Sequence, residues 1–281
     1  MQTKSFQTVS AAQAQLTHNA IRASSVITPL ILTYNEAPNI RRTLEKLSWA
    51  GDIVVVDSFS QDETPEIVRS FAAVRLLQRT FDEHALQWNF GVDACSTDWV
   101  LALDADYVLS DELVAELKEW SPNREASAYF AQFVYCIHGR LLRGSLYPSR
   151  AVLFERRNCR YVQDGHTQTL QIKGASGCLK NPIYHDDRKS LARWLWSQDR
   201  YAALEAEKLL AASAGTLSLP DRLRRRIWPA PFLVLFYTLF VKRALLDGWP
   251  GWYYTLQRTV AESILSLKLA ERRLLGKRNE K

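Results

Sequence analysis

The sequence lacks the short motifs that mark several large classes of nucleotide-binding and metal-binding proteins. It contains neither a GxGxxG dinucleotide loop nor a GxxxxGK[ST] phosphate-binding loop. Its four cysteines, at positions 95, 136, 159 and 178, form no CxxC pair. A dinucleotide fold, a P-loop protein, a zinc site and a disulfide framework are therefore disfavoured, and a reducing compartment fits best.

The first 24 residues lack the apolar segment of a secretory signal peptide. They are rich in Gln, Ser, Thr and Ala, and Lys4 and Arg22 are their strong bases. We expect residues 1–24 to form a flexible tail, although their low acidic content also resembles an organellar transit peptide.

Acidic residues are fewer than basic ones, which gives the 281-residue chain a net charge of +6 and a pI near 9.1. Such a charge suits nucleic acid, anionic lipid or a phosphorylated ligand. The basic residues concentrate late in the chain and alternate with apolar segments, which favours a membrane surface over nucleic acid. They include Arg222, Arg224, Arg225, Arg226, Lys242, Arg243, Arg272, Arg273, Lys277 and Arg278.

The first part of the chain alternates between strand-like and helix-like segments, as a parallel α/β sheet requires. Strands are expected at 26–34, 53–57, 74–78 and 99–103, and helices at 39–47, 66–71 and 84–95. Later strands at 128–137, 151–155 and 167–172, with a short one before His185, predict an antiparallel second half.

The sequence becomes helical beyond about residue 190, so we expect three regions. These are a tail (1–24), an α/β domain (25–190) and a helical C-terminal region (191–281). In the last region, 191–214 and 251–275 read as helices.

Polar residues follow three of the predicted parallel strands, where open α/β sheets bind their ligands. They are Thr33-Tyr-Asn-Glu36, Asp57-Ser-Phe-Ser-Gln-Asp62 and Asp104-Ala-Asp106. Residues i and i+2 of a strand point the same way, so Asp104 and Asp106 are placed to face one Mg²⁺ or Mn²⁺ that holds a diphosphate. Taken alone, this DxD pattern also fits an ordinary acidic loop.

In this order and spacing, TYNE, VVVDSFSQDET and LDAD resemble the inverting family 2 glycosyltransferases, which have the GT-A fold. Segments 138–156 (HGRLLRGSLYPSRAVLFER) and 181–188 (NPIYHDDR) resemble the branch of lipopolysaccharide-core β-glucosyltransferases. The resemblance implies a Rossmann-like mixed sheet with a helical extension. It also implies hexosyl transfer with inversion, from a nucleotide diphosphate donor such as a UDP-sugar to a glycan or lipid-linked acceptor, in cell-envelope polysaccharide synthesis.

The resemblance also implies roles for individual residues of the donor site. Thr33, Tyr34 and Glu36 would line the nucleoside pocket, and Asp57 would hold the base, which is expected to be uracil. Asp57 outside this motif would read as a turn or capping residue.

Three residues are implied as ligands of the metal ion, Mg²⁺ or Mn²⁺. Asp104 would contact ribose or the metal, Asp106 would bind the metal, and His185 would complete the site. A single histidine is as often a structural residue. Asn89 stands where the family often carries a donor-site asparagine, but helix packing is an equal explanation.

Inversion requires a base that takes the proton of the acceptor hydroxyl. The candidate segment is 161–167, in which Asp164 and His166 are the titratable groups besides Tyr161. Where the family commonly shows an acidic pair or an acid beside a histidine, this chain has Gly165 and Thr167. The base assignment therefore stays open, with Asp164 favoured over His166.

Rival functions fit the motifs less well. A nucleotidyltransferase would carry a Gly-rich basic loop after the first strand, whereas residues 33–38 contain neither Gly nor a base. A phosphatase that forms an aspartyl-phosphate would carry its DxD near the first strand and a Thr shortly after it. A catalytically inactive, membrane-associated sugar-nucleotide-binding protein of the same fold remains the alternative.

The segment 227–241 is uncharged over fifteen residues, which is shorter than the roughly twenty that span a membrane. Basic residues flank the segment on both sides, and Trp and Tyr occur around it. We expect a peripheral or monotopic element on the cytoplasmic face of the inner membrane, with 251–275 beside it as an amphipathic partner. The alternative is a buried helix that covers the catalytic sheet or forms a dimer, so the oligomeric state stays open.

Overall fold

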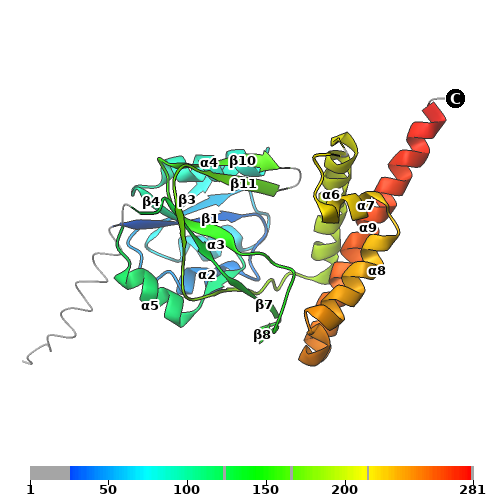
Figure 1. Cartoon of the computed structure of the whole chain (residues 1–281). Helices are drawn as coiled ribbons and strands as arrows, with labels where there is room; N and C mark the ends of the chain where they lie inside the picture. The colour runs from blue at the N-terminus through cyan, green and yellow to red at the C-terminus, as the bar shows by residue number, and fades with distance from the viewer. Residues whose placement is uncertain (1–25, 123–124, 165–166, 214, 280–281) are drawn as a thin grey trace, which may run out of the picture.

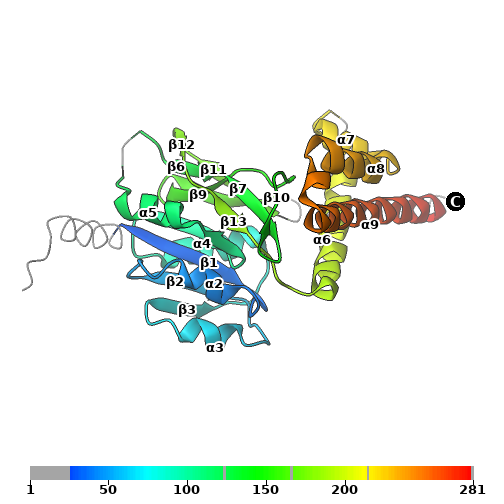
Figure 2. The same ribbon diagram turned by 90° about the horizontal axis from the view of Figure 1, so that it is seen from below.

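The computed structural model describes residues 26–122, 125–164, 167–213 and 215–279. The predicted N-terminal tail (1–24) and His166 lie outside these residues. Figures 1 and 2 show two bodies side by side, a sheet body that contains the strands and a helical unit formed by the last four α-helices.

The centre of the sheet body is a seven-stranded mixed sheet with the order β12-β6-β9-β4-β1-β2-β3. Four of its strands are parallel, as the sequence predicts: β4 (Trp99–Asp104), β1 (Ile27–Thr33), β2 (Ile53–Asp57) and β3 (Val74–Gln78). The helices between them are α2 (Ile40–Glu45), α3 (Thr64–Arg69) and α4 (His84–Ala94). Strand β2 is buried on both faces, which explains its unbroken run of apolar residues.

The second half of the sheet body departs from the prediction. The expected strand 128–137 is interrupted at Gln132 and divides between two sheets. β6 (Ala128–Ala131) joins the large sheet, whereas β7 (Phe133–Ile137) joins a four-stranded sheet with the order β5-β13-β7-β8. The other strands of this half are β5 (Tyr107–Leu109), β8 (Arg140–Leu141), β9 (Arg150–Glu155), β12 (Ser176–Cys178) and β13 (Ile183–His185).

The prediction of an antiparallel second half was partly wrong. β9 does run antiparallel to β4 and β6, but β12 pairs with β6 in parallel, and β13 pairs with β7 in parallel. Apolar alternation reports which face of a strand is buried and carries no information about the direction of its partner. A separate antiparallel hairpin joins β10 (Cys159–Asp164), which the pattern did not reveal, to β11 (Thr167–Ile172).

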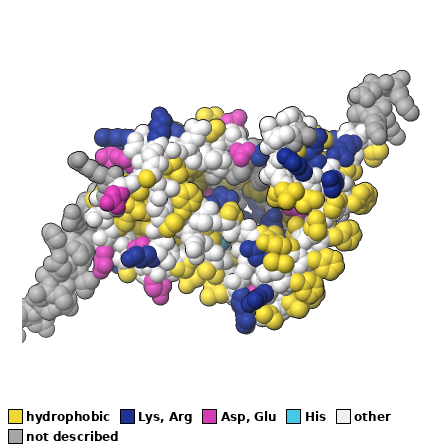
Figure 3. Space-filling view, in the orientation of Figure 1, with side chains coloured by type: hydrophobic (Ala, Val, Ile, Leu, Met, Phe, Trp, Pro, Cys, Tyr) yellow, Lys and Arg dark blue, Asp and Glu magenta, His cyan; other side chains and the backbone are white. Residues whose placement is uncertain are grey.

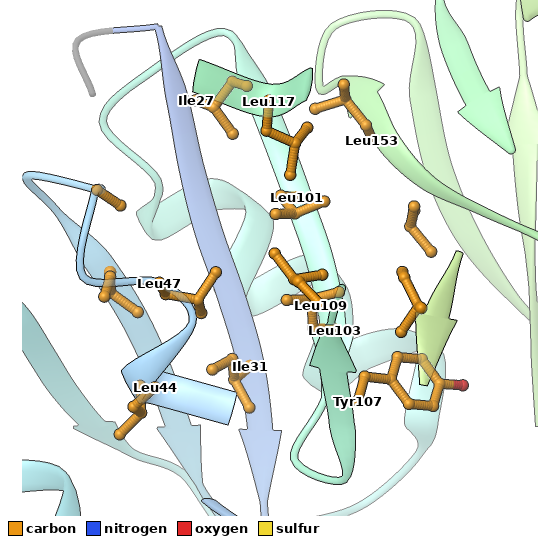
Figure 4. Close-up of a cluster of buried hydrophobic side chains, with 14 of the residues drawn as sticks. Ile27, Ile31, Leu44, Leu47, Leu101, Leu103, Tyr107, Leu109, Leu117 and Leu153 are labelled. Atoms are coloured by element: carbon orange, nitrogen blue, oxygen red, sulfur yellow. The ribbon is translucent and has the colours of Figure 1, made fainter. Parts of the chain in front are cut away.

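The main hydrophobic core lies between the large sheet and the helices α2 and α5 (Asp111–Glu119). Figure 4 shows Leu44 and Leu47 beside Ile31, and Leu101 between Leu117 and Leu103. A second cluster, which includes Leu30, Trp88 and Phe154, fills the opposite face under α4. Burying each side chain of this size contributes about 1.5–3 kcal/mol to folding. The packed core therefore holds the strand ends in fixed positions.

The helical unit consists of α6 (Leu191–Ala211), α7 (Leu219–Arg225), α8 (Pro229–Phe236) and α9 (Trp249–Asn279). A π-helical turn, η1 (Tyr237–Val241), and a 3-10 turn, η2 (Ala244–Asp247), connect α8 to α9. The uncharged segment is therefore α8 with η1, and no helix among the described residues is long and apolar enough to cross a membrane. Ala206, Leu209, Leu265 and Leu269 form the core of the unit.

The helical unit is attached to the sheet body through the loop that follows β8. Tyr254 of α9 is 2% exposed and packs against Ile137 and Leu142, and its hydroxyl accepts a hydrogen bond from Leu146 N at 2.8 Å. In the same loop, Arg143 N donates to Asp247 Oδ2 at 3.1 Å. The unit therefore helps to position the loop.

This attachment predicts that Tyr254→Ala destabilises the protein by about 3–5 kcal/mol, because it leaves a cavity between the bodies and an unpaired amide at Leu146. Trp252→Ala is the matched control, since Trp252 lies on the exposed side of the same helix turn and should change stability by less than about 0.5 kcal/mol. Chemical denaturation measures both. Equal stabilities would contradict the packing role of Tyr254.

Candidate active site

The end of β2 presents a carboxylate held by several hydrogen bonds. Asp57 is buried, and its Oδ1 accepts from Thr33 Oγ1 at 2.9 Å and from Ser60 Oγ at 2.5 Å. Its Oδ2 accepts from Ser60 N at 2.9 Å. The strand register puts Thr33 directly opposite Asp57, so the hydroxyl of Thr33 orients this acid.

The loops after β1 and β2 are tied together by side chains that sequence reasoning passed over. Asn35 N donates to Ser60 Oγ at 2.8 Å, and Glu36 N donates to Thr64 Oγ1 at 2.7 Å. Asn35 has a φ of 55°, a left-handed conformation that asparagine tolerates better than most residues. The signal for this role was the cluster of Asn, Ser and Thr at two neighbouring strand ends.

Glu36 forms a nearly buried ion pair with Lys189. The distance from Lys189 Nζ to Glu36 Oε1 is 2.7 Å, and Asn39 Nδ2 donates to Glu36 Oε2 at 2.9 Å. Burial raises the pKa of Glu36 to about 7, Lys189 opposes this shift, and the charge of Asp106 adds to it. Ionisation of Glu36 is therefore less favourable here than for a glutamate in water, at the rim where its backbone follows β1.

Asp106 and His185 are in contact at the same rim. His185 Nε2 lies 3.3 Å from Asp106 Oδ2, whereas Asp106 Oδ1 and His185 Nδ1 are buried and have no hydrogen-bond partner among the residues that the structure describes. Burial favours a higher pKa for Asp106, but the interaction with His185 outweighs it and holds the pKa below its ordinary value. An ionised carboxylate with an unpartnered oxygen beside an imidazole is a donor set that suits a divalent cation.

Three tyrosines surround the imidazole of His185. Its ring centroid lies 4.4 Å from that of Tyr147, 4.6 Å from Tyr135 and 5.3 Å from Tyr107. The small sheet creates this arrangement, because His185 is opposite Tyr107 on β5 and opposite Tyr135 on β7. The hydroxyl groups of Tyr107 and Tyr147 also share a hydrogen bond.

Asp104 and Asp106 do not lie on one face of a strand, contrary to the prediction. β4 ends at Asp104, and residues 105–106 form a turn before β5. Within the residues that the structure describes, no group of three or more His, Cys, Asp and Glu side chains is arranged to hold a metal ion. The three-ligand set of Asp104, Asp106 and His185 stays a prediction, of which the structure brings two members into contact.

The first helix of the helical unit borders this rim. Lys208 Nζ of α6 lies 2.7 Å from Oδ1 of Asp164, the candidate base at the end of β10. The guanidinium of Arg193, also on α6, lies 5.0 Å from the ring centroid of Tyr34 and 4.1 Å from that of Trp196. Tyr34 is exposed, so its predicted role in the nucleoside pocket requires Arg193 to share or leave its ring face.

Asn89 has a structural role in this chain. Its Nδ2 donates to Tyr161 O at 2.9 Å, and its Oδ1 accepts from Tyr161 N at 3.1 Å. The side chain therefore ties α4 to β10, which agrees with the packing explanation.

Comparison with known proteins identifies the class that the sheet and its acidic rim indicate. The sequence model of Glycosyl transferase family 2 matches residues 26–180, which is more than half of the chain. The chain therefore belongs to glycosyl transferase family 2, and the expected GT-A type of α/β fold with C-terminal helices is confirmed.

Individual relatives agree with this assignment. An uncharacterized glycosyltransferase of Rickettsia felis is 31% identical over 89% of this chain and 92% of its own length. A Rhizobium meliloti protein named lipopolysaccharide core biosynthesis glycosyltransferase LpsC is 28% identical over 90% of this chain and 94% of its own. For an uncharacterized glycosyltransferase of Rickettsia bellii, 33% identical, the match spans 106 residues, or 36% of that protein.

Two solved structures resemble the course of this chain at low sequence identity. Residues 1–349 of S. aureus TarS with UDP-GlcNAc match 89% of this chain and 92% of that chain at 14% identity and a TM-score of 0.45. Glucosyl-3-phosphoglycerate synthase from Mycobacterium tuberculosis with Mn²⁺, UDP and glucosyl-3-phosphoglycerate matches 76% and 88%, at 14% identity and a TM-score of 0.45.

The raised pKa of Glu36 predicts how Glu36→Gln changes the dependence of stability on pH. A raised pKa in the folded state means that ionising Glu36 costs folding free energy as the pH rises from about 4.5 towards 7 and above. The variant should therefore gain about 2–3 kcal/mol relative to the wild type between pH 4 and pH 8. Denaturation at both pH values measures the difference, and a constant offset between the two proteins would refute it.

Proposed function

We propose that this glycosyltransferase moves a hexose from a UDP-sugar to a hydroxyl of a glycan or lipid-linked acceptor, with inversion at the anomeric carbon and with Mg²⁺ or Mn²⁺. The observation that carries the proposal is the Asp106–His185 contact at the rim where β1 and β2 end. Each of the two side chains has one buried atom with no partner in the described part of the chain. The LpsC relationship supports a cell-envelope glycan as the acceptor.

In this proposal the donor lies across the ends of β1, β2 and β4. Asp57, oriented by Thr33 and Ser60, accepts a hydrogen bond from the uracil, and Tyr34 offers a ring face to the base. Glu36 and Asp104 border the ribose. The fixed carboxylate of Asp57 selects for the base, because a base whose N–H group is placed differently would not donate a hydrogen bond to it.

The residues present fit a divalent cation. Asp106 and His185 would hold it, with Asp104 as the third candidate, and the bound ion would neutralise charge on the diphosphate leaving group. Asp106 is nearly buried, so its charge acts in a region of low dielectric and is little screened. The tyrosines around His185 hold its ring in place.

Asp164 is the proposed base, and His166 is the alternative. A base accepts the proton of the acceptor hydroxyl as that oxygen attacks the anomeric carbon from the side opposite the diphosphate. Asp164 must release Lys208 before it can accept a proton from that hydroxyl. Because Lys208 is on α6, this helix borders the acceptor side of the site. An inactive sugar-nucleotide-binding protein would retain donor binding and lack this exchange.

The helical unit supports a peripheral location at the cytoplasmic face of the membrane. Figure 3 shows hydrophobic side chains gathered over this unit. They include Trp228, Phe232, Phe236, Phe240, Val241, Leu246, Trp249 and Trp252, all exposed. Arg226 and Lys242 lie at the two ends of the α8–η1 segment, which is the composition of an interfacial element that binds anionic lipid.

The proposed cation site predicts that Asp106→Asn lowers UDP release from UDP-glucose or UDP-GlcNAc, measured with Mn²⁺, by at least about 100-fold. Asn keeps the shape of this buried side chain, so the fold should persist. Asp98→Asn, at an exposed ion pair with Arg157, is the control and should retain full activity. Undiminished release by Asp106→Asn, or by the wild type in EDTA, would rule out metal assistance.

The proposed base predicts that Asp164→Asn reduces turnover by about 10²–10⁴-fold and leaves UDP binding nearly unchanged. The readouts are sugar transfer and the dissociation constant of UDP. A far larger loss in His166→Gln would exchange the two roles. Donor binding without turnover in the wild type would favour the inactive sugar-nucleotide-binding protein.

The proposed location predicts that replacing Phe236 and Phe240 by Ser lowers binding to phosphatidylglycerol vesicles about tenfold or more. The two rings are exposed and 6.1 Å apart, so both can enter the lipid headgroup region together. Leu86→Ser, at an exposed position of α4 in the sheet body, is the control. Cosedimentation measures binding, and equal binding by all three proteins would contradict a membrane surface at α8.

A further inference from the structure

α9 carries an arginine that the proposed donor site leaves without a function. The Nε of Arg258 is buried and has no hydrogen-bond partner among the described residues. A buried donor without a partner costs about 1–3 kcal/mol, and more when the group is charged. Native structures retain such exceptions at strained or functional sites, or where a water molecule, an ion or a ligand supplies the missing partner.

The position of Arg258 relates it to the candidate active site. It lies one helical turn after Tyr254, on the same side of α9. The ring centroid of Tyr254 is 4.7 Å from that of Tyr135, which in turn is 4.6 Å from His185. Arg258 is therefore two ring contacts away from the histidine that touches Asp106.

The ring contacts from Tyr254 to Tyr135 and from Tyr135 to His185 put this side of α9 next to the candidate active site. Figure 3 shows Lys and Arg side chains beside the hollow between the two bodies.

The membrane-facing side of α9 is a different surface. Trp252, Leu256 and Val260 are exposed, whereas Tyr254, between Trp252 and Leu256 in sequence, is fully buried against the sheet body. Arg258 lies on the same side of α9 as Tyr254. A lipid headgroup that contacts the exposed side of α9 therefore does not reach Arg258. The side of α9 that carries Tyr254 faces the sheet body, so a partner for Arg258 is sought on that side.

From these observations we infer that Arg258 anchors an oxyanion, a phosphate or carboxylate group, of the acceptor molecule. A guanidinium pairs with such groups through two parallel hydrogen bonds, which fixes orientation as well as adding affinity. In this arrangement Tyr135 lies between the anchored group and the cation site. A hydroxyl elsewhere on the same acceptor then points towards the sugar donor. This inference rests on the proposed function and adds the charge class of the acceptor to it.

The test uses full-length protein, with inorganic phosphate as the probe for the anchor and UDP with Mn²⁺ as the probe for the donor site. Isothermal titration should give saturable phosphate binding that is weakened about tenfold or more in Arg258→Gln. Arg41→Gln removes an exposed arginine of the sheet body and should leave phosphate binding unchanged. UDP binding should be the same in all three proteins.

Two further measurements separate the explanations. Arg258→Lys keeps the charge without the planar fork, so it should bind phosphate with intermediate strength, and it serves in place of Arg258→Gln if that variant unfolds. Phosphate binding that is absent in the wild type, or equal in the Arg258 variants, would overturn the inference. So would a loss of binding to phosphatidylglycerol vesicles in Arg258→Gln with phosphate binding intact, because Arg258 would then serve a lipid. Absent UDP binding would instead count against the proposed function.

Discussion

The register of three parallel strands determines where the chemistry of this protein is located. Thr33 of β1 pairs with Asp57 of β2, and Leu32 of β1 pairs with Asp104 of β4, so three strand ends reach the same edge within one residue of each other. The strands are buried on both faces, so the packing of α2 and α4 against the sheet fixes the positions of their ends. A rim of polar loops supported by a rigid core follows from this constraint.

The small sheet adds the second group of site residues to that rim. β13 lies between β5 and β7, and this pairing brings His185 to Asp106, which is 79 positions earlier in the sequence, with Tyr107 and Tyr135 on either side. The helical unit then closes the other side, since α6 reaches Asp164 through Lys208 and α9 reaches Tyr135 through Tyr254. The C-terminal helices are therefore part of the surroundings of the site as well as a candidate membrane surface.

Much of the first half could be predicted from the sequence, because its strands are runs of β-branched residues that end in Asp or in polar loops. The same runs located Thr33 and Asp57, which the structure joins by a hydrogen bond. The interruption at Gln132 could not be predicted, since both flanking strands have the same apolar pattern and differ only in the sheet that they join. Asp106 was misplaced on a strand face because a turn and a strand end look alike in two residues of sequence.

Lys189, Lys208 and Arg258 were missed for a different reason. Lys189 pairs with Glu36 across 153 positions, and a basic residue in sequence does not reveal which acid it will meet. Such pairs depend on tertiary packing, so spacing rules that detect contacts within one helix do not detect them. The resemblance to known transferases supplied the strand-end motifs but said nothing about the contacts of the helical unit.

The central claim is that the edge formed by β1, β2 and β4 binds a uridine diphosphate donor together with a divalent cation. Calorimetric titration of the wild-type protein with UDP, and separately with ADP, in the presence and absence of Mn²⁺ tests it most directly. The account predicts saturable UDP binding that strengthens about tenfold or more with Mn²⁺ and is much tighter than ADP binding. UDP binding that is absent, insensitive to Mn²⁺ or no tighter than ADP binding would contradict it.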